Sequence, residues 1–162
     1  MYPFKLRVLV TCLVLGLAKY FKQENILFLF ALTWALDVID CNPIFRPDLD
    51  CKRFAYHRTD KILDWCTYFS ILLLFGNVFD PTTRHLMWAL LAWRLIGVIG
   101  YAITNNVTYL HIFFDGLNST MFVAYLASKS TYVKTHYVPS ILAGLAFKVA
   151  LERVHHRENY KL

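Results

Sequence analysis

Long apolar stretches separated by short polar breaks are the main pattern of this chain. The pattern predicts six helices, at residues 5–20, 25–41, 60–79, 84–104, 108–128 and 138–154. Most of these segments approach the roughly 20 apolar residues that cross a bilayer core. Turn-forming pairs such as Asp80-Pro81 and Asn105-Asn106 fall in the breaks. We therefore predict an all-α polytopic membrane helix bundle that forms one transmembrane domain over residues 1–162.

Composition favours the same class. Hydrophobic residues make up 57% of the chain, aromatic residues 17%, and the mean hydropathy is +0.42, well above the usual soluble balance. Lys19 and Lys22 follow the first apolar segment where a signal peptide would have its cleavage site. The segment 5–20 is therefore expected to be a mature helix.

Basic residues gather on one side of the predicted spans. With the N-terminus inside, eleven Lys and Arg residues fall on the inner side and five on the outer side. The positive-inside rule then predicts a multi-pass protein with both termini and the 42–59 loop on the cytoplasmic side. Anionic lipid headgroups account for the net charge of +6, so no nucleic-acid partner is expected.

Acidic residues cluster around the 42–59 loop, since six of the eleven lie between Asp37 and Asp64. Asp37 and Asp40 are three residues apart, and Asp60 and Asp64 are four apart, so each pair shares one helix face. Crowded carboxylates near a membrane repel one another unless they are paired or neutralised. A hard divalent cation removes that cost, so we predict a site for Mg²⁺, with Mn²⁺ as the alternative, at these four aspartates.

A structural role is the alternative for the same aspartates. Asp60 and Asp64 could cap the third helix, whose N-terminal dipole favours negative charge. Asp37 and Asp40 could pair with nearby arginines. Capping does not account for Asp37 and Asp40, because acids at a helix C-terminus oppose the dipole.

The paired aspartates resemble the motif DxxDGxxARx8GxxxDxxxD of the CDP-alcohol phosphatidyltransferases, a family with six membrane spans. Asp37-Val38-Ile39-Asp40 and Asp60-Lys61-Ile62-Leu63-Asp64 stand at the corresponding places. The resemblance implies that Asp37, Asp40 and Asp60 ligate the metal, and that Asp64 beside them is the general base. It also implies a Mg²⁺-dependent transfer from a CDP-linked lipid to a small alcohol in phospholipid synthesis.

The match to this motif is incomplete. Cys41 and Tyr56 stand where the motif has glycines, and Asp40 and Asp60 are twenty residues apart instead of eighteen. In a second alignment, the segment from Lys61 to Asp64 resembles the family's GKxLDPxxDK segment. Asp64 is then the third aspartate and Tyr68 takes the place of the base. The second alignment implies the family's fold without its catalyst.

Basic residues beside the acids are candidates for binding a phosphorylated substrate. They are Arg46, Arg58, Lys61 and Arg94. Arg94 lies deep in the fourth segment, where the family often has an arginine that can meet a substrate phosphate. An ion pair with Asp115 is the structural alternative. His111 lies four residues before Asp115, the spacing of a metal or proton-relay pair. Two residues are too few for such a site, so a polar contact inside the bundle is favoured.

Two other classes of function compete with the enzyme. A non-catalytic small subunit or scaffold of a larger complex would use the same charges for polar contacts. An ion or proton pathway through Arg94, His111 and Asp115 is less favoured, because the chain has no Gly-rich filter or regular arginine ladder. The sequence leaves open which alcohol is used, which membrane hosts the protein and whether two chains form a homodimer.

Overall fold

The structure, a computed structural model, describes residues 2–20, 25–39 and 54–159, with side chains at 8–20, 25–35 and 58–150. The described residues are helical and contain no strands, so the all-α class is confirmed for this part of the chain. The elements are α1 (Tyr2–Tyr20), α2 (Ile26–Ile39), α3 (Phe54–Phe75), the 3-10 helix η1 (Gly76–Val78), α4 (Pro81–Thr104), α5 (Thr108–Ile112), α6 (Leu117–Lys129), α7 (Thr131–Thr135) and α8 (Tyr137–Asn159).

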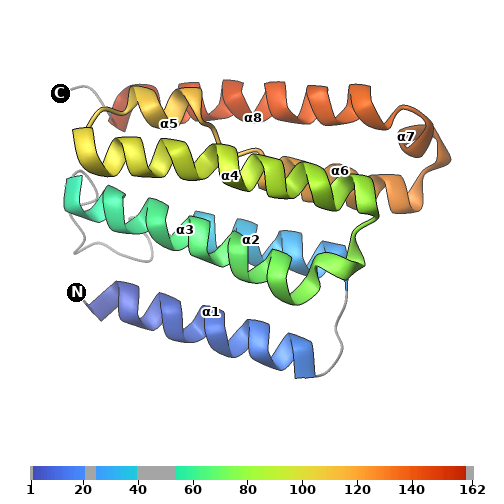
Figure 1. Cartoon of the computed structure of the whole chain (residues 1–162), viewed down its shortest axis with the longest axis horizontal. Coiled ribbons are helices and arrows are strands. Elements are labelled where there is room, and N and C mark those ends of the chain that lie inside the picture. The colour runs from blue at the N-terminus through green and yellow to red at the C-terminus, as the bar shows by residue number, and fades with distance from the viewer. Residues whose placement is uncertain (1, 21–24, 40–53, 160–162) are drawn as a thin grey trace.

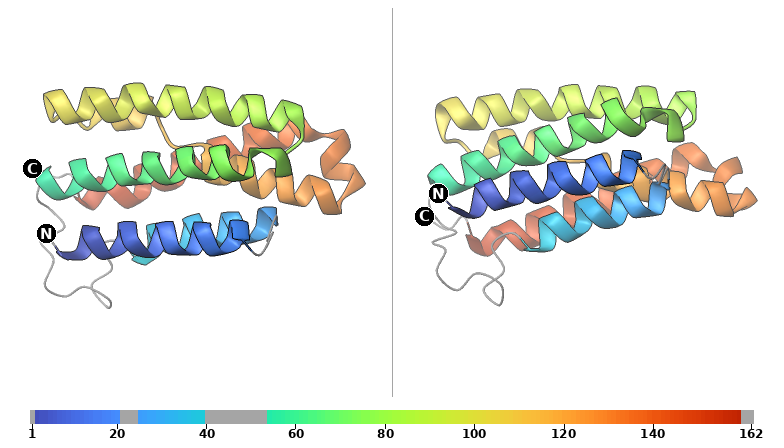
Figure 2. Two further views of the ribbon diagram at one scale, coloured as in Figure 1. Left: turned by 60° about the horizontal axis from the view of Figure 1, so that its bottom comes forward. Right: turned by 90° about the horizontal axis from the view of Figure 1, so that it is seen from below.

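The long helices lie side by side along one bundle axis and alternate in direction (Figure 1). Helix α1 begins and α8 ends at the same end of the bundle (Figures 1 and 2). Helix α2 also ends there, and α3 begins there. We call this the terminal end and the opposite end, which carries α7, the distal end.

The core lies where α2, α3, α4 and α6 pack against one another. Each of these helices contributes side chains that are fully or almost fully buried: Leu29, Ile71, Phe75, Met87, Leu91, Leu117 and Met121. Helix α1 adds Leu15 and Ala18. Removal of these apolar surfaces from solvent holds α3 against α4, the two helices that carry the described candidate residues.

Local sequence explains the limits of α4. Asp80 precedes the helix and its Oδ1 accepts a hydrogen bond from the Thr83 amide at 3.1 Å. Pro81 occupies the first turn, where a missing N–H costs nothing. Asn105 ends the helix at φ 55°, a left-handed conformation that Asn adopts more readily than most residues. The breaks predicted at Asp80-Pro81 and Asn105-Asn106 are confirmed.

Helix α3 begins at Phe54 and not at residue 60 as predicted. Asp60 and Asp64 therefore lie in later turns and do not cap its N-terminus, so the capping alternative is wrong. Residues 54–59 of the predicted 42–59 loop belong to α3, and the rest of that loop lies outside the described residues.

The predicted segment 108–128 is not one continuous helix. Helix α5 ends at Ile112 and α6 begins at Leu117, with Asp115 and Gly116 buried between them. Gly97 of α4 allows the end of α5 to approach closely, since a Cβ at Gly97 would lie 2.5 Å from the Phe113 Cβ. The apolar pattern continues across this break and hides it. The Asp115-Gly116 pair is the turn signal that indicates it.

Helix α4 is the one described helix that is both long and apolar enough to cross a membrane. Shorter apolar helices cover Val8–Tyr20, Ile26–Ala35 and Tyr137–Ala150. A buried core helix of a soluble protein passes the same test, but only 33% of the α4 window is buried inside the bundle. This finding supports association with a membrane and does not determine the number of spans.

Candidate functional site

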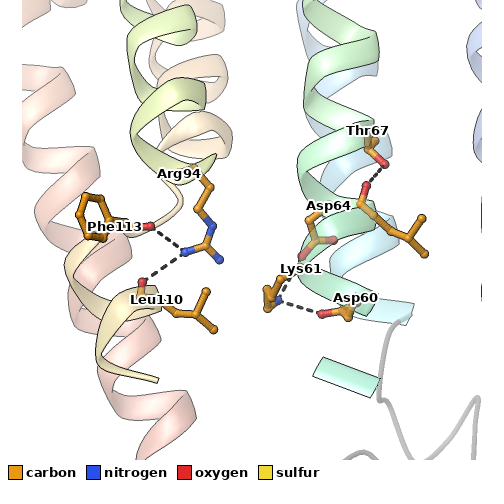
Figure 3. Close-up of polar contacts among 8 residues, drawn as sticks. Asp60, Lys61, Asp64, Thr67, Arg94, Leu110 and Phe113 are labelled. Atoms are coloured by element: carbon orange, nitrogen blue, oxygen red, sulfur yellow. Dashed lines mark hydrogen bonds and ion pairs between the residues drawn. The ribbon is translucent and has the colours of Figure 1, made fainter. Parts of the chain in front are cut away.

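Asp60, Lys61 and Asp64 form a compact charged cluster near the start of α3. The Lys61 Nζ lies 2.9 Å from Asp60 Oδ2 and 3.1 Å from Asp64 Oδ2 (Figure 3). A single ammonium thus contacts both carboxylates, which confirms that Asp60 and Asp64 share a helix face. We call these three residues the α3 charge cluster.

The α3 charge cluster is largely removed from solvent. The side chains of Lys61, Asp60 and Asp64 are 14%, 7% and 16% exposed. Taking a carboxylate out of water is costly unless an opposite charge and hydrogen bonds replace its hydration. Lys61 supplies part of that compensation to both acids, and its single positive charge balances one of the two negative charges.

Arg94 is a buried charge of α4, with 5% of its surface exposed. Its Nη1 donates hydrogen bonds to the carbonyl oxygens of Leu110 at 3.2 Å and Phe113 at 2.8 Å (Figure 3). These carbonyls lie at the end of α5, where a helix leaves its last carbonyls without partners in the helix. Arg94 therefore points into the bundle.

The ion pair predicted between Arg94 and Asp115 is wrong. Among the described residues, the partners of the Arg94 guanidinium are the two carbonyls, which lie nearer because α5 ends before Asp115 is reached. Asp115 instead accepts a hydrogen bond from the Leu117 amide at 3.0 Å, at the start of α6. Arg94 therefore lies at the negative end of α5 and Asp115 at the positive end of α6, so both charges stabilise the break.

Lys61 and Arg94 lie at the same level of the bundle. The Trp65 Nε1 donates to the Leu91 carbonyl at 3.0 Å, and α3 and α4 run in opposite directions. Because the helices are antiparallel, the residue three positions after Leu91, which is Arg94, lies at the level of the residue three positions before Trp65, which is Ile62. Lys61 is the neighbour of Ile62 in the chain. Figure 3 shows the side chains of Lys61 and Arg94 turned toward the space between these helices. The structure thus brings two predicted substrate-binding cations to one region.

Part of the predicted site falls outside the described side chains, namely Asp37, Asp40 and Arg46. The backbone of Asp37 lies in the last turn of α2, at the terminal end. Arg58 is described and is exposed on α3. Within the described part of the chain, no three His, Cys, Asp or Glu side chains gather as a metal group. The convergence of the four aspartates stays a prediction.

The described residues include the right kind of ligand for a hard cation, but too few of them for a full ligand set. The carboxylates of Asp60 and Asp64 are the oxygen ligands that Mg²⁺ and Mn²⁺ prefer. Lys61 contacts one oxygen of each carboxylate, so a cation at this place meets a positive charge already present. A full ligand set therefore depends on Asp37 and Asp40.

Three further polar contacts were not predicted from the sequence. At the distal end, the buried Thr83 hydroxyl donates to Asp80 and pairs with the Tyr137 hydroxyl, which ties α4 to α8. Partial burial raises the pKa of Asp80, but the hydrogen bonds from the Thr83 hydroxyl and neighbouring amides outweigh it, so this pKa lies below its ordinary value. In the core, Thr33 of α2 donates to the Asn118 Oδ1 of α6.

Comparison with protein-family models, curated proteins and solved structures found no match for this chain. The resemblance to the CDP-alcohol phosphatidyltransferases therefore rests on the spacing of the aspartates, and the function must be argued from the residues themselves.

Proposed function

We propose that this chain is an integral membrane protein with six spans and cytoplasmic termini. The spans are α1, α2, α3, α4, the pair α5 and α6, and α8. Helices α3, α4 and α8 contain 22, 24 and 23 residues, and at a rise of about 1.5 Å per residue such helices match a hydrocarbon core of about 30 Å. Exposed apolar side chains on three helices, such as Leu13 at 58%, Ile103 at 78% and Leu142 at 61%, support a lipid-facing surface.

Reporter fusions test this topology. Fusions at both termini and at residues 105–107 are expected to report the cytoplasmic side, while a fusion within 129–136 reports the opposite side. Termini on opposite sides would reject the six-span arrangement and the cytoplasmic place of the α3 charge cluster.

We further propose that the protein is a Mg²⁺-dependent transferase of the CDP-alcohol phosphatidyltransferase type. One observation carries the proposal: two carboxylates one turn apart, Asp60 and Asp64, are held together in a largely desolvated place beside two cations. Helix α2, which carries Asp37 in its last turn, ends at the same end of the bundle. Desolvated carboxylates beside cations are typical of sites that handle charged groups.

In the proposed reaction, the hydroxyl oxygen of the small alcohol attacks the phosphorus that carries the lipid. A new P–O bond forms, the bond from phosphorus to CMP breaks, and Asp64 accepts the hydroxyl proton. Asp37, Asp40, Asp60 and Asp64 would hold the cation, which supplies charge neutralisation on the diphosphate when it is bound. The described candidates Arg58, Lys61 and Arg94 would attract the phosphates to α3 and α4, and Arg46, outside the described residues, is a further candidate.

A non-catalytic membrane subunit or scaffold is the second candidate. It is favoured by the observation that Lys61 forms ion pairs with both acids of the α3 charge cluster, while Arg94 is bound to backbone carbonyls. Ion pairs of this kind also serve to set helix packing. In that case the charged residues stabilise the bundle or contact a partner without chemistry.

A CMP-release assay separates the two candidates. The purified full chain in lipid nanodiscs is supplied with a CDP-linked diacylglycerol lipid, a panel of small alcohols and either Mg²⁺, Mn²⁺ or a chelator. We expect metal-dependent release of CMP that falls at least about 100-fold in Asp64→Asn, because loss of a positioned base typically costs that much. Asp80→Asn is the matched control at the distal end, since Asn also caps a helix.

The outcomes are distinct for the two candidates. Equal CMP release by the wild type and Asp64→Asn would reject Asp64 as the base. Folded wild-type protein that releases no CMP with any alcohol would reject the transferase and favour the subunit.

A further inference from the structure

Three buried polar side chains lie around the break between α5 and α6. They are Arg94 of α4, Asp115 in the break and Asn118 in the first turn of α6, with 5%, 9% and 6% of their surfaces exposed. Buried polar atoms in folded proteins nearly always have a hydrogen-bond partner, either from the protein or from an ordered water. Each polar atom of these three side chains is therefore expected to have one.

Arg94 uses only part of its hydrogen-bonding capacity. Both of its hydrogen bonds, to the carbonyl oxygens of Leu110 and Phe113, come from Nη1, and both carbonyls lie on one side of the guanidinium (Figure 3). A guanidinium also carries N–H donors on Nε and Nη2, which form its second edge. That edge of Arg94 has no partner among the described residues. Charged donors are thus left in a place that the bundle largely closes to solvent.

Asp115 and Asn118 also keep polar atoms to spare. Asp115 accepts one hydrogen bond, from the Leu117 amide to Oδ1, and its Oδ2 has no partner within the described part of the chain. Asn118 accepts from the Thr33 hydroxyl at Oδ1, and its Nδ2 has no partner in the ranges 8–20, 25–35 and 58–150. The break therefore offers both donors and an acceptor to a small polar molecule.

Arg94 and Asp115 are close to each other without direct contact. The Phe113 carbonyl that Arg94 binds at 2.8 Å stands two residues before Asp115, and two residues of extended chain span at most roughly 7 Å. Opposite charges at such a separation attract strongly where solvent is largely excluded. A water between them supplies the missing hydrogen bonds, since a buried water typically has about two to four polar partners.

We propose that the break between α5 and α6 is a water-binding site, in which a buried water joins Arg94 to Asp115. The water accepts from the Nε and Nη2 edge of Arg94 and donates to Asp115 Oδ2, with Asn118 Nδ2 as a further donor. Arg94 lies ten residues before the end of α4, which is about 15 Å at the helical rise. In the proposed six-span bundle, the water therefore lies near the middle of the membrane.

A double-mutant cycle tests whether the two charges are linked. Arg94→Met and Asp115→Asn are made singly and together in the full chain, and unfolding is measured in detergent. Asn keeps an acceptor for the Leu117 amide but loses the charge. Asp115→Asn is expected to raise the unfolding equilibrium constant at least about threefold more in the wild-type background than in Arg94→Met, a coupling typical of residues in one hydrogen-bond network.

Asp80→Asn is the matched control for the cycle. Asp80 also accepts from a backbone amide at the start of a helix, but it lies at the distal end of the bundle. Its replacement is expected to have the same effect in the wild-type and Arg94→Met backgrounds, within about twofold, because distant sites act independently.

Nuclear magnetic resonance detects the water itself in the wild-type chain, so this measurement does not depend on the folding of a variant. The Leu117 amide donates to the carboxylate that the water contacts. Its proton is expected to show a nuclear Overhauser effect to a long-lived water in lipid nanodiscs. The amide of Met121, one turn later in α6 and equally buried, is expected to show none.

The outcomes decide the inference without reference to the transferase. Coupling in the cycle together with a water contact at Leu117 supports the bridge. Additive effects of the two replacements would overturn it, because the charges would then act independently. Coupling without a water contact at Leu117 would overturn it as well, because the charges would then interact without a bridging water.

Discussion

Replacing Arg94 with methionine tests whether its side chain holds the break between α5 and α6. The change removes the Nη1 group that donates to the carbonyl oxygens of Leu110 and Phe113, and it keeps an unbranched side chain of similar length. Each buried carbonyl left without a donor costs about 1–3 kcal/mol. Loss of the favourable charge at the end of α5 adds about 0.5 kcal/mol. Methionine also avoids the cost of burying a guanidinium, and this gain in stability opposes both losses.

The two carbonyls decide the sign, because their hydrogen bonds compensate much of the burial cost of Arg94 in the native bundle. We expect Arg94→Met to lower the free energy of unfolding by about 2–4 kcal/mol, a loss typical of a broken buried polar network. Denaturation in detergent, followed by helix content, measures the change. Hydrogen exchange at the amides of residues 108–120 should show that the loss of protection is centred on the break.

Arg84→Met is the matched control on the same helix. Arg84 donates to the Asn77 side chain at 3.2 Å near the surface, so the same chemical change is expected to alter stability by no more than about 0.5 kcal/mol. Wild-type stability and unchanged exchange in Arg94→Met would refute the role of the two carbonyl hydrogen bonds.

Two further perturbations probe packing and pH. Gly97→Val should destabilise the bundle by about 1–3 kcal/mol through overpacking against Phe113. Gly16→Val, at a position that meets nothing within 4 Å, should be nearly neutral in the same denaturation assay, because Val and Gly have similar helix propensities. Because the pKa of Asp80 is lower in the folded state, its contribution to stability is present above the ordinary value of 3.8 and is lost as the pH falls through the folded value. The free energy of unfolding, measured between pH 6 and 3, should therefore fall more in wild type than in Asp80→Asn. An identical dependence on pH in the two proteins would contradict the assignment.

Local patterns in the sequence were enough to predict most of the long helices and several of their limits. Asp80-Pro81 and Asn105 act on the backbone next to them, so their effect is independent of the rest of the fold. The spacing of Asp60 and Asp64 likewise predicts a shared face, since it depends only on the helical repeat. The same local patterns did not predict that α3 begins at Phe54.

Only the tertiary structure decided where the polar groups find partners. The break after Ile112 depends on the close approach of α5 to Gly97 and on the donor that Arg94 brings from α4. A charged side chain has several possible partners among opposite charges and carbonyls, and the helices that pack together determine which of them it contacts. The sequence by itself thus determined the class of the fold, the places of most long helices and which residues carry charge. Packing of α3, α4 and α5 determined that the segment 108–128 is broken and that Arg94 contacts carbonyls instead of Asp115.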